Sequence, residues 1–303
     1  MNTTAATFPA PSTDEPSLGH CFRLLVSCPD SSGIVAAIAG FLRDAGANIT
    51  HADQYSTGAH DGLFFLRMQF GLKLDPIALE EFNAQFDREV ASSFDMTWSV
   101  TDAAEPKRIA VFVSRYDHCL LDILWRWRRR ELHADIAVVI SNHEDMRGDV
   151  EAFGIPFVYI PVEKGHKPEA EARQIQAVER YGPIDAVVLA RYMQILSGDF
   201  LSDLGIPVIN IHHSFLPAFA GAGPYGKAKE RGVKLVGATA HYVTEELDAG
   251  PIIEQDVIRV THEDDADTLE RLGADIERAV FARAVQWHCE DRVLLHGNTT
   301  VVF

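Results

Sequence analysis

Apolar and polar positions in the first third of the chain follow two different periods. Within residues 64–70 apolar side chains occupy every second position, with Arg67 and Gln69 between them, which predicts a half-buried strand. Residues 34–45 repeat apolar side chains at helical spacing, and Gly46 predicts the end of that helix. Further strands are expected at 22–27, 47–55 and 94–100, and a second helix at 76–90. This β-α-β-β-α-β order predicts a ferredoxin-like domain.

From Arg108 onward the pattern changes to short apolar runs separated by helical or polar stretches. Such runs are typical of buried parallel strands, with helices packed on both faces of one sheet. The runs are Ile109–Val113, Ile136–Ile140, Phe157–Ile160, Ala186–Leu189 and Val208–Ile211. Two more strands are expected within 233–259, and then a long helix over 269–287. The sequence therefore predicts an α/β fold with a doubly wound, mostly parallel sheet, which binds ligands beyond the carboxyl ends of its strands.

These changes divide the chain into four segments. Residues 1–19 are rich in Thr, Pro, Ala and acidic residues, and we expect a disordered tail rather than a signal peptide. Residues 20–101 form the predicted small domain. Residues 102–107 are short, polar and contain Pro106, which predicts a linker to the larger domain at 108–303.

The net charge of the chain argues against two classes of binding partner. A formal net charge of -17 and a pI near 5.1 argue against nucleic acid or an anionic membrane, since both bind basic surfaces. One basic cluster, at 125–130, offers a nucleic-acid contact as the alternative, but the spacing of Leu120, Leu124 and Trp127 favours the last turn of a helix. No apolar run is long enough to cross a membrane, and the four cysteines are scattered without CxxC spacing. We expect a soluble, cytoplasmic protein with free thiols.

Candidate chemistry gathers where the last of the apolar runs ends. Asn210 and His212 are two residues apart in a predicted strand, so both side chains point to the same face. Asp248 opens a Gly-Pro turn that can fold back against this strand end. An amide that donates to an oxyanion, an imidazole that carries a proton and a carboxylate that orients it suit hydrolysis or transfer of an acyl group. We predict that Asn210, His212 and Asp248 are catalytic.

Plainer interpretations exist for the same residues. Asn210 could cap the turn that follows, and His212 or His213 could be ordinary polar residues at a strand end. A metal site formed by His212, His213 and His241 is conceivable, but no ligand spacing supports one and the chemistry does not require a metal. We therefore predict no metal. His213 could shape the loop or contact substrate.

The motif around these residues resembles a known family. Asn-x-His-x-Ser, Leu-Pro and Leu-Asp-x-Gly-Pro resemble the folate-dependent formyltransferase fold, over residues 108–303. The chain is most similar to the formyltetrahydrofolate deformylases, in the stretches VLARYMQILS at 188–197, INIHHSFLPAF at 209–219, KLVGATAHYVT at 234–244 and LDAGPIIEQDV at 247–257. The Cys-Pro-Asp-x-x-Gly turn at 28–33 and the following Gly-Ala-Asn-Ile resemble an ACT domain. The resemblance implies hydrolysis of 10-formyltetrahydrofolate to formate and tetrahydrofolate, in one-carbon and purine metabolism. The folate would be the substrate, and no cofactor is expected.

The resemblance also implies where the folate binds. Two segments would form the pocket, Arg191–Leu196 and His241–Glu245, whose predicted contacts are Arg191, Met193, Ile195, Leu196, His241, Val243, Thr244 and Glu245. Ordinary core packing is the alternative for Met193, Ile195 and Leu196.

Two other functions remain open. Related transferases that formylate a phosphate-bearing amine carry a glycine-rich loop after their first strand, whereas residues 113–119 contain no glycine. Transfer to an amine is nevertheless the alternative function. A regulatory protein that senses folate or an amino acid without turnover is the other. The loop with Gly223 and Gly226 departs from the deformylase pattern, which leaves its effect on the site open.

The resemblance to ACT domains implies an effector and an assembly. A small amino acid such as glycine or methionine would bind at Asp30, Gly33 and Asn48, for which a helix cap and a strand start are the alternative roles. We also expect a homo-dimer or homo-tetramer.

Overall fold

The computed structural model describes residues 20–303 except 59–60, 74–75 and 219–223. The predicted tail at 1–19 and Gly223 lie outside these residues. The chain divides into two compact units, one ending at Glu105 and one beginning at Pro106. Strand β4 of the first unit ends at Asp102, and strand β5 of the second begins at Lys107.

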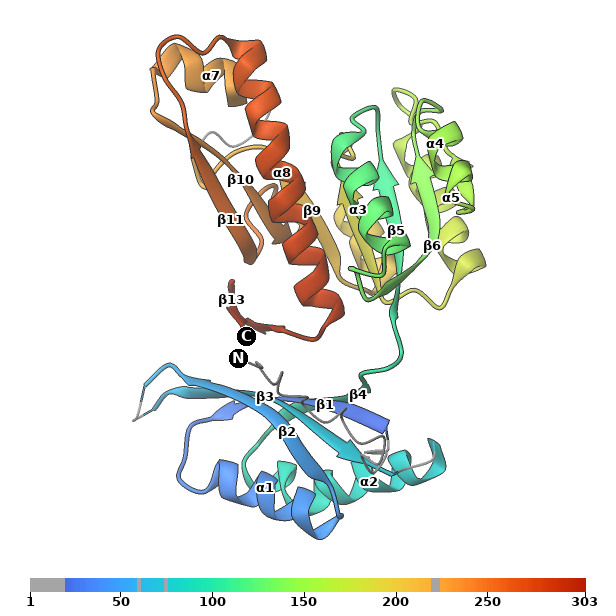
Figure 1. The fold of residues 1–303 in the computed structure, drawn as a ribbon. Coiled ribbons are helices and arrows are strands. Elements are labelled where there is room, and N and C mark those ends of the chain that lie inside the picture. Colours follow the sequence, from blue (N-terminus) through green and yellow to red (C-terminus); the bar gives the residue numbers. More distant parts are fainter. Residues whose placement is uncertain (1–19, 59–60, 74–75, 219–223) are drawn as a thin grey trace, which may run out of the picture. The chain divides into compact units, whose positions relative to one another are not determined.

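The first unit is a four-stranded antiparallel sheet in the order β2-β3-β1-β4, shown in blue and cyan in Figure 1. Its elements are β1 (His20–Pro29), α1 (Ile34–Asp44), β2 (Asn48–Ser56), β3 (Leu63–Leu72), α2 (Pro76–Glu89), the short 3-10 helix η1 (Ala91–Ser93) and β4 (Thr97–Asp102). This order confirms the ferredoxin-like prediction. Both helices pack on one face of the sheet, around Phe41, Phe70 and Phe86.

Strand β3 differs from the prediction in one respect. Its alternating apolar residues are buried as expected, but Arg67 is only 6% exposed and Phe65 only 1%. The prediction of a half-buried strand is therefore wrong, since side chains from both faces of β3 are buried. A strand period shows which residues share a face, but it does not show what covers the opposite face.

The second unit is built on a seven-stranded sheet in the order β11-β10-β9-β8-β5-β6-β7. Strands β5 to β9 are parallel, and β10 runs antiparallel to both of its neighbours. The strands are β5 (Lys107–Val113), β6 (Ala134–Ser141), β7 (Phe157–Tyr159), β8 (Ala186–Ala190), β9 (Val208–His212), β10 (Leu235–Tyr242) and β11 (Ile252–Arg259). This arrangement confirms the predicted doubly wound, mostly parallel sheet.

Helices cover both faces of this sheet. The helices are α3 (His118–Arg128), α4 (Arg147–Ala152), α5 (Lys167–Tyr181), α6 (Gly198–Leu204), α7 (Pro224–Arg231) and α8 (Ala266–Cys289). Alternate residues of β5 show the two layers: Val111 packs with α3 and α8, whereas Phe112 packs with α5 and α6. Beyond α8 the chain forms a hairpin, β12 (Val293–His296) and β13 (Thr299–Val302), which the sequence pattern did not predict.

The strand order places the ligand-binding region. Strand β5 is followed in the chain by β6 on one side, whereas β8 and β9 lie on its other side. Parallel sheets bind ligands where the strand order reverses in this way, outside the carboxyl ends of the strands. Here those ends are Ser114 after β5, Arg191 after β8 and His212 at the end of β9.

Two smaller predictions are also tested. Arg126 and Arg128 occupy the last turn of α3, and the Arg128 guanidinium lies over the Trp125 ring, so the basic cluster is a helix end as predicted. The four cysteines are free thiols, three of them buried. Among the described helices, none is long and apolar enough to cross a membrane.

Candidate active site

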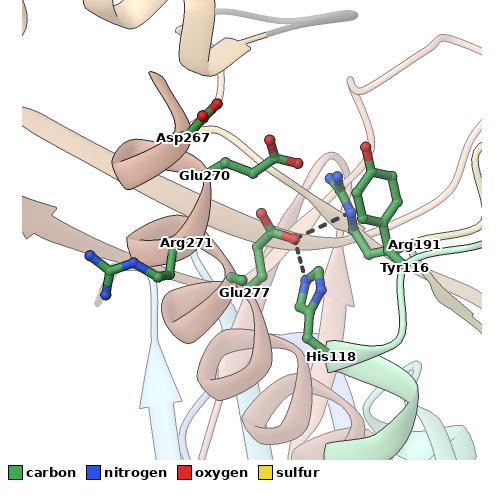
Figure 2. Close-up of a pocket in the computed structure, with 8 residues that line it drawn as sticks. Tyr116, His118, Arg191, Asp267, Glu270, Arg271 and Glu277 are labelled. Carbon is green, nitrogen blue, oxygen red and sulfur yellow. Dashed lines mark hydrogen bonds and ion pairs between the residues drawn. The ribbon is translucent and has the colours of Figure 1, made fainter. Parts of the chain in front are cut away.

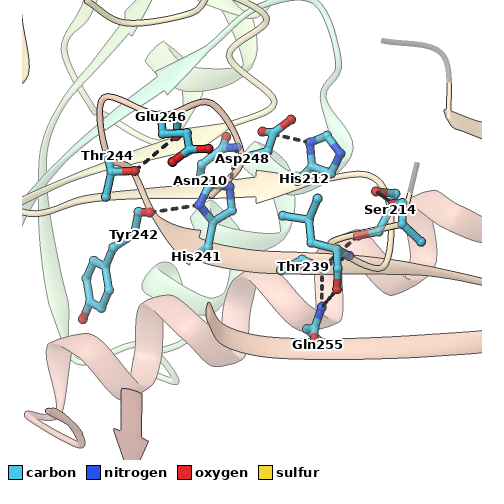
Figure 3. A network of polar contacts seen from close by, with 12 residues as sticks. Asn210, His212, Ser214, Thr239, His241, Tyr242, Thr244, Glu246, Asp248 and Gln255 are labelled. Atoms are coloured by element: carbon cyan, nitrogen blue, oxygen red, sulfur yellow. Dashed lines mark hydrogen bonds and ion pairs between the residues drawn. The ribbon is translucent and has the colours of Figure 1, made fainter. Parts of the chain in front are cut away.

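Two neighbouring cavities open where these strands end, and Arg191 lines both. The first, of about 300 Å³, lies between α8 and the segments after β5 and β8 (Figure 2). The second, of about 290 Å³, lies against β9 and contains all three predicted catalytic residues (Figure 3).

Asp248 meets His212 in the second cavity. The Nδ1 atom of His212 lies 3.3 Å from the Oδ1 atom of Asp248, and both side chains are more than nine-tenths buried. Nδ1 therefore faces the carboxylate, and Nε2 is the other ring nitrogen. Nε2 is buried without a hydrogen-bond partner among the described residues. Such a buried unsatisfied group costs about 1–3 kcal/mol, and in a native protein it calls for an explanation such as a catalytic role.

The Asp-x-Gly-Pro turn has a structural reason for its glycine. A Cβ atom on Gly250 would lie 1.9 Å from the carbonyl oxygen of Tyr242, so no larger residue fits there. Asp248 itself adopts a left-handed backbone conformation, with φ of 56°, as does Arg191 with φ of 59°. Residues held in this region cost about 1–3 kcal/mol and cluster at functional sites.

His241 fixes the direction of the Asn210 amide. The two residues are directly paired across β9 and β10. The Nδ1 atom of His241 lies 2.9 Å from the Tyr242 carbonyl oxygen, which can only accept, so Nδ1 carries the hydrogen. The Nε2 atom of His241, 3.3 Å from Asn210 Nδ2, must then accept from the amide. One N–H of Asn210 is held in this way, and its amide nitrogen is fixed as a donor on the cavity side of β9.

Burial keeps His241 uncharged. It lowers the pKa of this ring, although the hydrogen bond to the Tyr242 carbonyl and the charge of Asp248 act in the opposite direction. His241 was predicted as a folate contact, and it does line the cavity. Both of its ring nitrogens, however, are already engaged by protein groups.

All eight predicted folate contacts line the same cavity as Asn210, His212 and Asp248. Met193 and Ile195 are 48% and 61% exposed, so core packing does not explain them. Leu196 is 8% exposed and belongs to the core, so the alternative role applies to it. Six further residues line the cavity, of which Tyr192 and Gln194 lie within the predicted segment Arg191–Leu196, whereas Leu189, Ile211, Glu246 and Leu247 were not among the predicted contacts.

A second set of buried polar residues holds the loop that follows β8. Glu171 of α5 accepts hydrogen bonds from the backbone N and the hydroxyl of Ser197, at 2.9 and 2.7 Å. Ser114 accepts a hydrogen bond from the backbone N of Met193 at 3.0 Å. Both residues are buried and lie far along the chain from this loop, and no sequence signal pointed to them.

Hydrogen bonds from a residue of β10 hold the turn that follows His213. Thr239 donates to the Ser214 carbonyl at 2.8 Å and accepts from the backbone N of Leu216 at 3.0 Å. Thr239 is fully buried and is paired directly with His212. The position of the Ser-x-Leu-Pro part of the motif is therefore set by the neighbouring strand.

The structure separates the predicted effector contacts. Asp30 follows the end of β1 and accepts a hydrogen bond from Ser56. Asn48 begins β2 and is paired with Gly71 of β3. Gly71 is paired in turn with Cys21, near the start of β1, so Asn48 lies level with the opposite end of that strand. The nine-residue step from Cys21 to Asp30 spans about 30 Å at the rise of a strand. One small amino acid cannot contact Asp30 and Asn48 of the same copy. Gly33 has φ of 99° and caps α1 without a side-chain hydrogen bond.

Comparison with known proteins agrees with the two units. The family described as Formyl transferase matches residues 107–285, and the family described as ACT domain matches residues 22–87. Together, the fold and the site define an ACT-containing protein of the formyl transferase class. Relatives with the same pair of units identify the family more closely.

The formyltetrahydrofolate deformylase of Mycobacterium tuberculosis is 55% identical over 281 residues, which are 93% of this chain and 90% of the relative. That of Bacillus subtilis is 54% identical over 284 residues, 93% of each chain. The crystal structure of a formyltetrahydrofolate deformylase from Pseudomonas syringae pv. tomato superimposes with a TM-score of 0.89 at 48% identity, covering 94% of this chain and 95% of that one. The chain belongs to the formyltetrahydrofolate deformylase family.

Proposed function

We propose that this protein hydrolyses 10-formyltetrahydrofolate to formate and tetrahydrofolate. The observation that carries the proposal is the meeting of Asn210, His212 and Asp248 in one cavity that also contains every predicted folate contact. Water adds its oxygen to the formyl carbon, the bond from that carbon to nitrogen breaks, and the nitrogen gains a proton. The formic acid released loses its own proton to give formate.

The geometry supports a role for each residue. Asp248 holds His212 through Nδ1, so Nε2 accepts the proton of the attacking water and later delivers it to the leaving nitrogen. Asn210 stabilises the tetrahedral oxyanion by donating from its oriented amide. No step requires a cofactor, because water is the second reactant.

Water is a better-supported acceptor than a phosphorylated amine. The segment after β5 contains no glycine, unlike the glycine-rich loop that cradles a phosphate in the related transferases. The Tyr116 ring lies under the Arg191 guanidinium at 4.5 Å, and Ser114 holds the backbone of Met193.

One assay separates hydrolysis, transfer and sensing. The protein is mixed with 10-formyltetrahydrofolate, with and without a phosphorylated amine, and formate and formylated amine are measured. Formate release without the amine is the expected result. Formylation of the amine without formate release would support the transferase, and folate binding without turnover would support the sensor.

We further propose that the ACT unit binds a small amino acid, glycine or methionine, and that the protein assembles as a homo-dimer or homo-tetramer. Strand β2 is an edge strand and is exposed along most of its length, including Ile49 and Tyr55. Because Asp30 and Asn48 lie at opposite ends of the sheet, they can share one ligand only if two copies bring them together. Oligomeric state measured with and without each amino acid tests both points, and an unchanged amino-acid response in Asp30→Ala would remove Asp30 from the effector site. The cytoplasmic location stays a prediction.

A further inference from the structure

A buried carboxylate outside the catalytic motif connects three segments that surround the active site. Glu277 of α8 is 1% exposed. Its Oε1 atom accepts a hydrogen bond from the Tyr225 hydroxyl at 2.6 Å, and its Oε2 atom accepts one from His118 Nε2 at 2.8 Å. The Nε atom of Arg191 lies 3.3 Å from Oε2 (Figure 2). Both oxygens of the carboxylate are thus engaged by protein groups.

The charges around Glu277 keep it ionised. Burial alone raises the pKa of this carboxyl group, but the hydrogen bond from His118, the charge of Arg191 and the hydrogen bond from Tyr225 together lower it to about 2. His118, Cys119 and Glu277 have the spacing of a metal site. Arg191 already supplies the positive charge, and burial raises the pKa of the Cys119 thiol, so this group is better explained as an internal ion pair.

Helix α8 leaves a gap through which the Tyr225 ring reaches this carboxylate. A Cβ atom on Gly273 would lie 1.9 Å from the Tyr225 hydroxyl oxygen and 2.2 Å from its Cζ. Gly273 precedes Glu277 by one helical turn, on the same face of α8. Tyr225 itself is 8% exposed. The ring is therefore held by contact with Gly273 and by a hydrogen bond to Glu277.

Tyr225 in turn holds His213. Their rings meet edge to face, with centroids 6.0 Å apart, and the ring of His213 lies 5.1 Å from that of His212. His213 lines the same cavity as the proposed catalytic residues. A continuous contact path thus runs from Glu277 through Tyr225 to His213 and the reacting centre.

We propose that His213 is a further catalytic residue that orients the attacking water, and that Tyr225 and Glu277 are positioning residues that hold its ring. This inference rests on the proposed hydrolysis of 10-formyltetrahydrofolate. Neither ring nitrogen of His213 hydrogen-bonds to another residue in the described part of the chain. Both nitrogens are therefore available to water or substrate.

The charge state of His213 fits this role. Burial and the charge of Arg191 lower its pKa to about 3, although Glu277 and Asp248 raise it and His212 lowers it further. At neutral pH the ring then has one donor and one acceptor nitrogen. The acceptor nitrogen can receive a hydrogen bond from a water molecule and so direct the water oxygen toward the formyl carbon. A protonated ring has no acceptor nitrogen and could not orient the water in this way.

The test uses His213→Asn in the full-length protein, with hydroxylamine as a competing nucleophile. Attack by hydroxylamine on the formyl carbon releases tetrahydrofolate and formohydroxamate, whereas attack by water releases tetrahydrofolate and formate. The amounts of formohydroxamate and formate therefore report which nucleophile reacted. We expect formate production to fall at least about tenfold, the KM for the folate to change less than about twofold, and the ratio of formohydroxamate to formate to rise. An equal loss of both products, or a kcat within about twofold of the wild type, would overturn the proposal.

Two further variants test the path to α8. Tyr225→Phe keeps the ring but removes the bond to Glu277, and Gly273→Ala displaces the ring without changing any charge. Both should raise the same product ratio, by less than His213→Asn does; an unchanged ratio in both would remove Tyr225 and Glu277 from the positioning role. The control is His133→Asn, which alters a half-buried histidine with a buried, unpartnered nitrogen directly before β6. It should match the wild type. Formate release by the wild type tests the hydrolase function itself, so the two failures are distinguishable.

Discussion

The Nδ2 atom of Asn210 lies 3.3 Å from the Nε2 atom of His241, and this contact decides which way the amide points. The tautomer of His241 is fixed by the Tyr242 carbonyl, so the imidazole must accept from Asn210. An oxyanion donor works best when its direction is set before the reaction begins. His241 therefore has a testable effect on catalysis through Asn210.

We expect His241→Phe to lower kcat about tenfold, because the Asn210 amide becomes free to rotate away from the oxyanion. His241→Gln should lose less, since its side-chain oxygen can accept from the amide. Steady-state rates of formate release for both variants check this. Equal activity in the two variants would show that the hydrogen bond to Asn210 does not matter.

Single replacement of Asn210, His212 or Asp248 by alanine should reduce turnover at least about a hundredfold in a folded protein. Loss of one oxyanion donor or of the proton carrier leaves the tetrahedral intermediate unsupported. Formate release is measured beside circular dichroism and the thermal midpoint. Near-normal turnover in any one variant removes that residue from the mechanism.

Gly250→Ala should impair catalysis more than stability. The added Cβ atom meets the Tyr242 carbonyl oxygen, and relief of that clash moves the turn that carries Asp248 away from His212. We expect activity to fall at least about tenfold and the free energy of unfolding to fall by about 1–3 kcal/mol. Gly148→Ala in α4, where nothing lies within 4 Å, is the control and should raise stability by about 0.5–1 kcal/mol with normal activity. Activity retained in Gly250→Ala would contradict the required close approach.

Glu171→Gln should weaken folate binding. Its carboxylate accepts two hydrogen bonds from Ser197, at the end of the loop that begins at Arg191. An amide can accept only one of them, so the loop loses support, and we expect the KM for the folate to rise about tenfold with a smaller change in kcat. Glu169→Gln, an exposed neighbour on α5, should leave both constants unchanged. A KM equal to that of the wild type would show that the loop holds its shape without Glu171.

His288 should make the protein less stable at mildly acidic pH. Burial and the charge of Lys107 lower its pKa from 6.5 to about 4, against the effects of Asp291 and Asp185. Between these values the unfolded chain binds a proton that the folded chain does not, so the contribution to stability is complete above about pH 6.5 and is lost as the pH falls toward 4. In His288→Gln the free energy of unfolding should depend less on pH in this window, measured by denaturant titration. His262→Gln, at an exposed site, should keep the wild-type dependence, and an unchanged slope in His288→Gln would contradict the prediction.

Much of the fold could be predicted from the sequence because its signals are local. Alternation and apolar runs depend on neighbouring residues, and they indicated the strands and helices of both units. The period of a strand placed Asn210 and His212 on one face, and the helical spacing around Trp127 identified the basic cluster as a helix end. The weak hairpin after α8 was missed, since two four-residue strands give little periodic signal.

The contacts that complete the site were decided by tertiary structure. Pairing of β9 with β10 brought His241 to Asn210, and the return of the chain at Gly250 brought Asp248 to His212. The antiparallel pairing of β1, β2 and β3 also separated Asp30 from Asn48. The sequence by itself determined which chemical groups are present and which of them share a strand face. Only the order in which distant strands and helices pack decided which groups touch, because hydrogen bonds and ion pairs act over a few ångströms whereas sequence periodicity describes a single element.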